Sequence, residues 1–159
     1  MKKFTLILVL VTASVLSSHG QQLSGKVFML GETQKDCSIQ AQDCDCCMSE
    51  LYFITEQQFA MVHYCGAGKT YTSGTYKIES KVLTLQFKQG SVYKSFDTGE
   101  SSWEKTTIKP ETFALSSCEN GTPLLINKGT SVLKYGLPLE WEKINEIVDS
   151  GEWKTLKGK

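Results

Sequence analysis

Short segments of alternating polar and apolar residues, separated by turn-forming residues, recur along the chain and constrain its fold more than any other feature. In the clearest of them, Leu83, Leu85 and Phe87 fall on one face and polar residues fall on the other. Such a strand packs one face against a core. The pattern predicts strands at Lys26 to Leu30, Glu50 to Thr55, Phe59 to Cys65, Tyr71 to Ile78, Val82 to Lys88, Val92 to Phe96, Trp103 to Lys109, Thr112 to Ser117, Leu124 to Asn127 and Ser131 to Lys134.

This many short strands in one chain predicts an all-β fold whose sheet edges must be removed. Closure into a barrel removes them completely, so we expect a small antiparallel up-and-down barrel of the lipocalin-like kind. The same strand spacing also fits a two-sheet sandwich. The mouth of such a barrel can hold a small ligand, although a barrel this small can equally be filled by its own side chains.

One segment has a helical rather than an alternating rhythm. Apolar residues between Trp141 and Val148 recur at spacings of three and one, and Pro138 suits a first helical turn. We therefore expect a short C-terminal amphipathic helix that ends near Gly151.

The first twenty residues have the pattern of a secretory signal. Lys2 and Lys3 precede a 13-residue apolar stretch, Phe4 to Leu16, and small residues follow it. A membrane anchor is the alternative interpretation, but crossing a bilayer takes about 20 apolar residues. We expect cleavage before Gln21, which leaves a mature chain with no transmembrane segment.

Residues 21–159 are then expected to form a single β-barrel domain that is secreted or periplasmic. Its 15 lysines and 17 acidic residues give a net charge of −2. A protein that neutralises phosphates with a basic surface would have the opposite balance, so we expect no nucleic-acid partner.

Export also determines the expected chemistry of the cysteines, because an oxidising compartment favours disulfides. The segment from Gly31 to Cys47 lacks an apolar pattern that would offset its ordering cost. We therefore predict that at least one cysteine near its end is bridged outside it, to Cys65 or Cys118. The six cysteines expected to form disulfides, with fifteen complete pairings open to them, are Cys37, Cys44, Cys46, Cys47, Cys65 and Cys118.

The same cysteines allow a metal-binding interpretation. Cys44 and Cys47 have C-x-x-C spacing, which lets two sulfurs converge on one thiophilic ion or form a redox-active pair, and Cys46 and Met48 add soft donors. Copper(I) would suit this set; otherwise no cofactor is expected.

A second group of soft donors lies on one predicted strand. Met61, His63 and Cys65 alternate, so their side chains share a face and form a copper-type donor set. In the simpler interpretation, Met61 is a core residue, Cys65 forms a disulfide and His63 lies near a barrel mouth.

Catalytic patterns are sparse. His63 is the single histidine that remains after signal removal, no G-x-S-x-G motif occurs, and the carboxylates are dispersed. The sequence thus favours a non-enzymatic barrel that binds a small ligand or a protein partner, without excluding an enzyme. The alternative is extracytoplasmic metal binding or redox sensing through the Cys44 to Cys47 cluster.

The stretch from Asp43 to Phe87 resembles small lipocalin-like barrels of bacterial envelopes. The residues that carry the resemblance are the C-x-x-C of Cys44 and Cys47, the hairpin sequence Ser73 to Ile78, and the L-x-L of Leu83 and Leu85. It is most similar to the N-terminal domain of the copper-resistance, envelope-stress lipoprotein family. The resemblance implies a barrel, with Cys44 and Cys47 matching a cysteine pair implicated in metal or redox sensing.

The chain also departs from that family. It has no lipid-attachment cysteine, it inserts Cys46 inside the pair, and it adds Cys37, Cys65 and Cys118. The resemblance therefore supports the fold more than the copper response.

Overall fold

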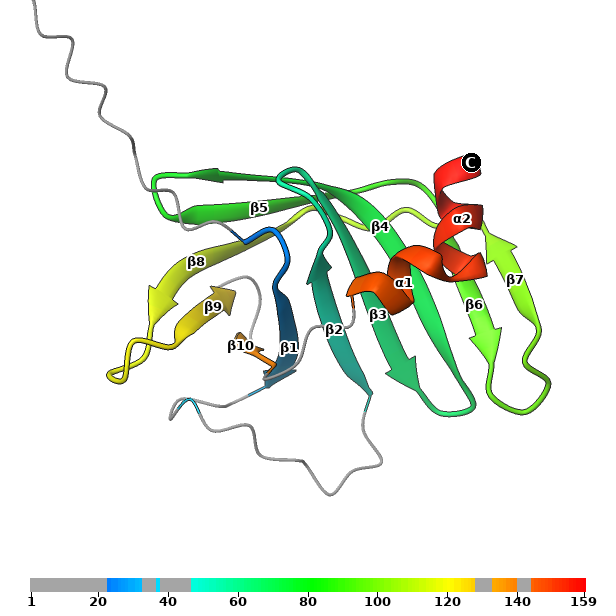
Figure 1. Ribbon diagram of the computed structural model, residues 1–159, viewed down its shortest axis with the longest axis horizontal. Helices are drawn as coiled ribbons and strands as arrows, with labels where there is room; N and C mark the ends of the chain where they lie inside the picture. Colours follow the sequence, from blue (N-terminus) through cyan, green and yellow to red (C-terminus); the bar gives the residue numbers. More distant parts are fainter. Residues whose placement is uncertain (1–22, 33–36, 38–46, 128–132, 140–143) are drawn as a thin grey trace, which may run out of the picture.

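The computed structural model describes residues 23–32, 37, 47–127, 133–139 and 144–159, which form one antiparallel sheet and two short helices (Figure 1). The expected signal peptide, residues 1–20, lies outside the described residues. The elements are β1 (Val27–Glu32), β2 (Met48–Phe53), β3 (Gln58–Cys65), β4 (Gly68–Glu79), β5 (Val82–Phe87), β6 (Ser91–Ser95), β7 (Ser101–Glu104), β8 (Glu111–Ser117), β9 (Pro123–Asn127), β10 (Lys134–Pro138), α1 (Ile144–Asp149) and α2 (Gly151–Gly158).

Within the described residues, eight strands close into a barrel. The order around it is β1, β2, β3, β4, β5, β8, β9 and β10, and each neighbouring pair is antiparallel. The last strand closes on the first, with Phe28 opposite Pro138 and Glu32 opposite Lys134. The prediction of an all-β up-and-down barrel with a C-terminal helix is therefore confirmed. The sandwich alternative is wrong, because the pairing of β1 with β10 closes these eight strands into a ring.

The inward-facing residues of these strands form the main hydrophobic core. Phe28, Phe53, Phe59 and Phe113 are fully buried there. Rings meet edge to face, with centroids 4.8 Å apart for Phe53 and Tyr76. Aromatic and aliphatic side chains thus fill the barrel interior, as they do in small barrels without a ligand chamber.

The strands β6 and β7 extend the sheet beyond the closed barrel. Gly74 of β4 pairs with Phe87 of β5, and Tyr71 of β4 pairs with Val92 of β6. The connection from Phe87 to Val92 is therefore two residues longer than the stretch of β4 that it faces, and these two residues form a bulge. Gly90 lies in this bulge with φ +100, and an added Cβ would come 2.8 Å from the Trp103 ring. The bulge directs β6 along the other half of β4 and enlarges the outer face there.

The outer face of the sheet carries a second hydrophobic cluster, which the C-terminal helices cover (Figure 1). Val62 and Tyr71 from the strands pack with Ile147, Trp153 and Leu156 from the helices. This is the reason for the amphipathic pattern at the C-terminus, because a sheet buries apolar residues on both faces only where something covers the second face.

The predicted C-terminal helix ends close to the expected position, with α1 ending at Asp149, but its predicted start at Pro138 is wrong. Pro138 is the last residue of β10, and a second helix begins at Gly151. The chain restarts the helix because the Ser150 hydroxyl caps it, accepting a hydrogen bond from Trp153 N at 3.1 Å. Residues 140–143, including the expected contact residue Trp141, lie outside the described residues.

Two strand predictions also differ from the structure. The strand expected over Trp103 to Lys109 ends at Glu104, because the chain there leaves β6 and crosses to pair with β5. Of the strand expected over Ser131 to Lys134, Ser131 and Val132 lie outside the described residues, and the strand found in this region, β10, runs from Lys134 to Pro138. The alternation pattern did not predict β10 because the strand contains a glycine and a proline. Gly136 is needed there because an added Cβ would lie 2.9 Å from Leu125.

Among the described residues, neither helix has the length and apolar character needed to span a membrane.

Candidate functional site

Two disulfides join the cysteine-rich segment to the barrel. Cys37 is bonded to Cys118, with Cα atoms 6.2 Å apart, and Cys47 to Cys65, with Cα atoms 4.3 Å apart. The structure thus has the bridge out of the segment that the sequence argument predicted. Cys44 and Cys46 lie outside the described residues. Cys47, the other member of the C-x-x-C pair proposed for copper, is bonded to Cys65.

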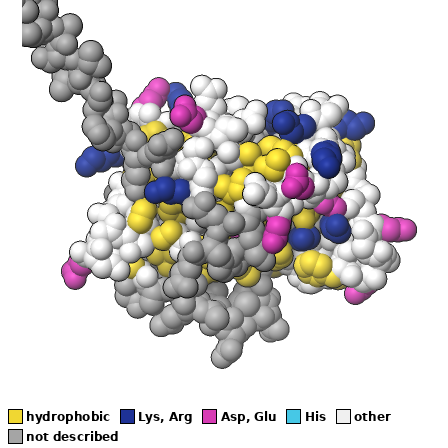
Figure 2. Space-filling view, in the orientation of Figure 1, with side chains coloured by type: hydrophobic (Ala, Val, Ile, Leu, Met, Phe, Trp, Pro, Cys, Tyr) yellow, Lys and Arg dark blue, Asp and Glu magenta, His cyan; other side chains and the backbone are white. Residues whose placement is uncertain are grey.

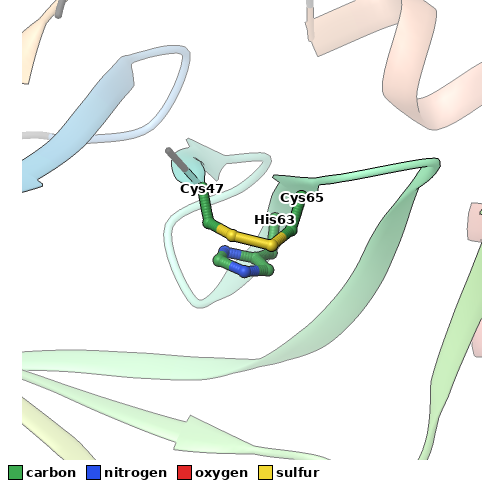
Figure 3. A group of neighbouring side chains, drawn as sticks. All are labelled: Cys47, His63 and Cys65. Carbon is green, nitrogen blue, oxygen red and sulfur yellow. A yellow bond between two sulfur atoms is a disulfide. The ribbon is translucent and has the colours of Figure 1, made fainter. Parts of the chain in front are cut away.

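The disulfide of Cys47 and Cys65 lies beside the imidazole of His63 at one end of the barrel (Figure 3). The possible ligand atoms of these three residues lie within 4.8 Å of one another. His63 and Cys65 follow Phe59 at alternate positions along β3, so they lie on the inward face of the sheet. His63 is exposed because it lies near the end of the strand. The His63 Nδ1 is 2.9 Å from the Ser49 hydroxyl, which orients the ring.

Met61 does not join this group. Its side chain packs against the barrel core, as the simpler interpretation of this strand expected. Among the described residues, the possible metal ligands gathered here are therefore two sulfurs and one imidazole.

A pocket of about 470 Å³ lies on the opposite, outer face of the same strands, beneath the C-terminal helices. Figure 2 shows lysine and acidic side chains interspersed with hydrophobic ones on the half of the surface that carries α1 and α2. Strands supply one wall and helices the other. The lining residues are Met48, Glu50, Tyr52, Tyr64, Lys69, Tyr71, Lys94, Glu146, Ile147, Ser150 and Glu152.

Two carboxylates of this pocket are buried, Glu50 at 6% and Glu152 at 5% exposed, and Glu50 is the one held by tyrosine hydroxyls instead of a lysine. The hydroxyls of Tyr52 and Tyr64 both donate to its Oε2, the second at 2.9 Å. Burial, and then the neighbouring carboxylate, raise the pKa of both tyrosines well above the ordinary value. Both phenols therefore remain protonated donors at any physiological pH.

An ion pair between the half-exposed Lys94 and the buried Glu152 joins α2 to the extended sheet at the edge of the pocket. Lys94 Nζ lies 2.9 Å from Glu152 Oε1, and the Ser101 hydroxyl donates to the same oxygen at 2.8 Å. Burial alone would raise the pKa of Glu152, but these hydrogen bonds outweigh it and hold the pKa below its usual value. The hydrogen bond to Glu152 likewise raises the pKa of Lys94. This pair fixes the helix that forms one wall.

The remaining lysine of the pocket lies against aromatic rings. Lys69 Nζ is 5.3 Å from the ring centroid of Tyr71 and 5.9 Å from that of Tyr64. These distances are those of cation–π contacts. The pocket therefore already accommodates one ammonium group on its tyrosine faces.

Sequence reasoning missed this pocket. It treated Glu50 as one of several dispersed carboxylates, although Met48, Glu50 and Tyr52 alternate along β2 and so share a face. That alternation was the available signal. The partners of Glu50 across the sheet and on the helices depend on register and packing, which the sequence pattern does not contain.

No family model and no curated protein matches the sequence at a significant level. Among solved structures, the chain is similar to a streptavidin-like protein from Bacteroides eggerthii, with a TM-score of 0.59 and 12% sequence identity. The match covers 84% of this chain and 93% of that protein. The similarity shows a streptavidin-like or lipocalin-like barrel fold and assigns no family.

Proposed function

We propose that this protein is an extracytoplasmic, non-enzymatic barrel that binds a small ligand in the pocket between the outer face of β2 to β4 and the C-terminal helices. The observation that carries the proposal is the pocket itself, about 470 Å³ with a buried carboxylate, Glu50, in its wall. Concave sites with a few convergent polar groups among larger side chains are the usual form of small-molecule sites. The two disulfides support an oxidising location.

The barrel interior is filled by side chains, whereas the outer pocket is not, and this difference supports the proposal. In barrels of eight strands, the space that holds a ligand is the same space that side chains fill. Here Phe28, Phe53, Phe59 and Phe113 occupy it with no exposed surface. The outer pocket, in comparison, needs no rearrangement of the core to admit a ligand.

Blocking the pocket is expected to abolish binding. Met48 lies in the pocket wall and is 37% exposed, so a Met48→Trp side chain can fill the pocket without entering the core. The matched control is Val82→Trp, since Val82 is 43% exposed and lies outside the pocket lining. A panel of small aryl amines, aryl carboxylates and aryl alcohols would be screened by thermal shift and confirmed by calorimetry. We expect M48W to weaken binding about tenfold or more, the scale of a lost hydrophobic or polar anchor, and V82W to leave it unchanged.

Two results would contradict the proposal. In one, no member of the panel raises the melting temperature of the native protein. In the other, a bound compound is unaffected by M48W and instead perturbs residues of the barrel interior in NMR spectra.

Metal binding or redox sensing is the second candidate function, and the proximity of Cys47, His63 and Cys65 favours it. A dithiol reductant would supply two electrons and two protons, converting the disulfide to two thiols while itself becoming a disulfide. Copper(I) would then displace the thiol protons and bind two thiolates and one imidazole, ligands that suit it.

The test uses the full mature chain in a Cys44→Ser, Cys46→Ser background, titrated with copper(I) against a chromophoric chelator under anaerobic conditions. We expect one copper(I) per reduced chain, none per oxidised chain, and affinity at least about tenfold weaker in His63→Gln. Binding that is lost in the background alone would assign copper to the Cys44 and Cys47 pair instead. Equal binding of copper(I) by the oxidised protein would contradict both the site at Cys47, His63 and Cys65 and the site at Cys44 and Cys47.

A further inference from the structure

The hydrogen bonds to the Glu50 carboxylate all go to one of its two oxygens. Both phenol donors contact Oε2, and within the described part of the chain no donor lies within hydrogen-bond distance of Oε1. A buried carboxylate normally has several donors, because leaving one of its oxygens without a partner costs free energy. Glu50 thus brings a buried acceptor to the wall of a pocket large enough for a ligand.

The two lysines that line the pocket within the described residues, Lys69 and Lys94, do not fill this role. Lys94 is paired with Glu152, and a hydrogen bond from Ser101 completes that carboxylate. Lys69 contacts the rings of Tyr64 and Tyr71 instead of forming an ion pair with Glu50. Its position shows that the electron-rich faces of these tyrosines attract an ammonium group, as ring quadrupoles do.

The tyrosines of the pocket also cannot supply a second donor to Glu50. Each phenol has one proton, and the protons of Tyr52 and Tyr64 are already committed to Oε2. What completes the carboxylate must therefore come from outside the described residues. A donor that also carries positive charge gains most, since hydrogen bonds between charged groups are the strongest kind.

We propose that the ligand of this pocket is a small organic cation with N–H donors, a primary ammonium, that donates to Glu50 Oε1 and packs its apolar part against the pocket tyrosines. This inference rests on the proposed function, because it assumes that the outer pocket is the ligand site.

Three compounds of similar shape provide the test: 2-phenylethylammonium, 2-phenylethanol and 3-phenylpropionate, each titrated by calorimetry into the native protein at low ionic strength. We expect the ammonium compound to bind at least about tenfold more tightly than the alcohol, the scale of one hydrogen bond between charged groups, and the carboxylate compound to bind weakest. Tetramethylammonium, a cation without N–H donors, should bind more weakly than the primary ammonium.

Two variants separate the role of Glu50 from general damage to the pocket. Glu50→Gln keeps an oxygen that accepts from both tyrosines, and it should weaken ammonium binding about 10- to 100-fold and weaken binding of the uncharged alcohol much less. Lys69→Met removes a positive charge from the pocket, so it should tighten ammonium binding by about two- to tenfold and weaken any binding of the carboxylate compound. The gain should shrink as salt is added.

The outcomes distinguish this inference from the proposed function. If the carboxylate or the alcohol binds best and M48W still blocks it, the pocket is the ligand site and the cation proposal is wrong. If none of the compounds or the wider panel binds, the proposed function fails first. Should Glu50→Gln not fold, the ranking of the three compounds on the native protein and the direction of the Lys69→Met effect still decide the question.

Discussion

Replacing Phe53 with alanine is expected to lower the free energy of unfolding by about 3 to 5 kcal/mol, the cost of deleting a buried aromatic ring and leaving a cavity. Phe53 has no exposed surface, and its ring meets those of Phe28 and Tyr76 edge to face, with centroids 5.8 and 4.8 Å away. Because the interior is filled by such rings, neighbouring side chains have little freedom to close the gap.

The matched control is Phe96→Ala, which removes the same ring from a site that is 54% exposed. It should change stability by less than about 0.5 kcal/mol. Urea unfolding of both variants with the disulfides intact, followed by tryptophan fluorescence and far-UV circular dichroism, measures the difference. Equal effects of the two substitutions would show that the interior is not packed as described.

Removing the disulfide of Cys37 and Cys118 is expected to destabilise the protein more than removing that of Cys47 and Cys65. The first closes 81 residues of sequence and the second 18. A cross-link restricts the unfolded chain more when the loop is longer, so the chain-entropy model gives about 4 to 5 kcal/mol for the first and about 3 kcal/mol for the second.

The double variants Cys37→Ser with Cys118→Ser, and Cys47→Ser with Cys65→Ser, test this order without creating a new free thiol at either site. Melting temperature and urea midpoint should both fall further in the first variant. The reverse order would mean that the Cys47 to Cys65 bridge stabilises the folded barrel end directly, for example by holding β2 and β3 in register.

Much of the fold could be predicted because a strand exposes its period in the sequence. Leu83 and Leu85 alternate with polar residues along β5, and both point into the core. Strands whose residues break the pattern could not be found in this way. In β10, Gly136 and Pro138 resemble a turn and a helix start, yet Gly136 lies in the barrel wall because Leu125 leaves no room for a side chain.

The presence of disulfides could be predicted from composition, but their pairing could not. Export and an even number of cysteines predict disulfides, and a polar segment without a core predicts a bridge to the barrel. Which cysteines pair depends on distance in the folded chain. Cys47 and Cys65 pair because they face each other across β2 and β3, one step beyond Met48 and Tyr64.

By itself, the sequence determined that this chain is all-β with a C-terminal amphipathic segment, because period-two alternation divides each strand into two faces, one of which is buried. Closure into a barrel instead of a sandwich was decided by the pairing of β1 with β10. Only the tertiary structure decided what lies on the other face. Glu50 and Tyr64 are distant in sequence, and antiparallel register together with the docking of α1 and α2 brings them into one pocket. Alternation specifies the side of the sheet to which a residue points, whereas its neighbours there depend on long-range pairing and on the packing of the helices that cover the sheet.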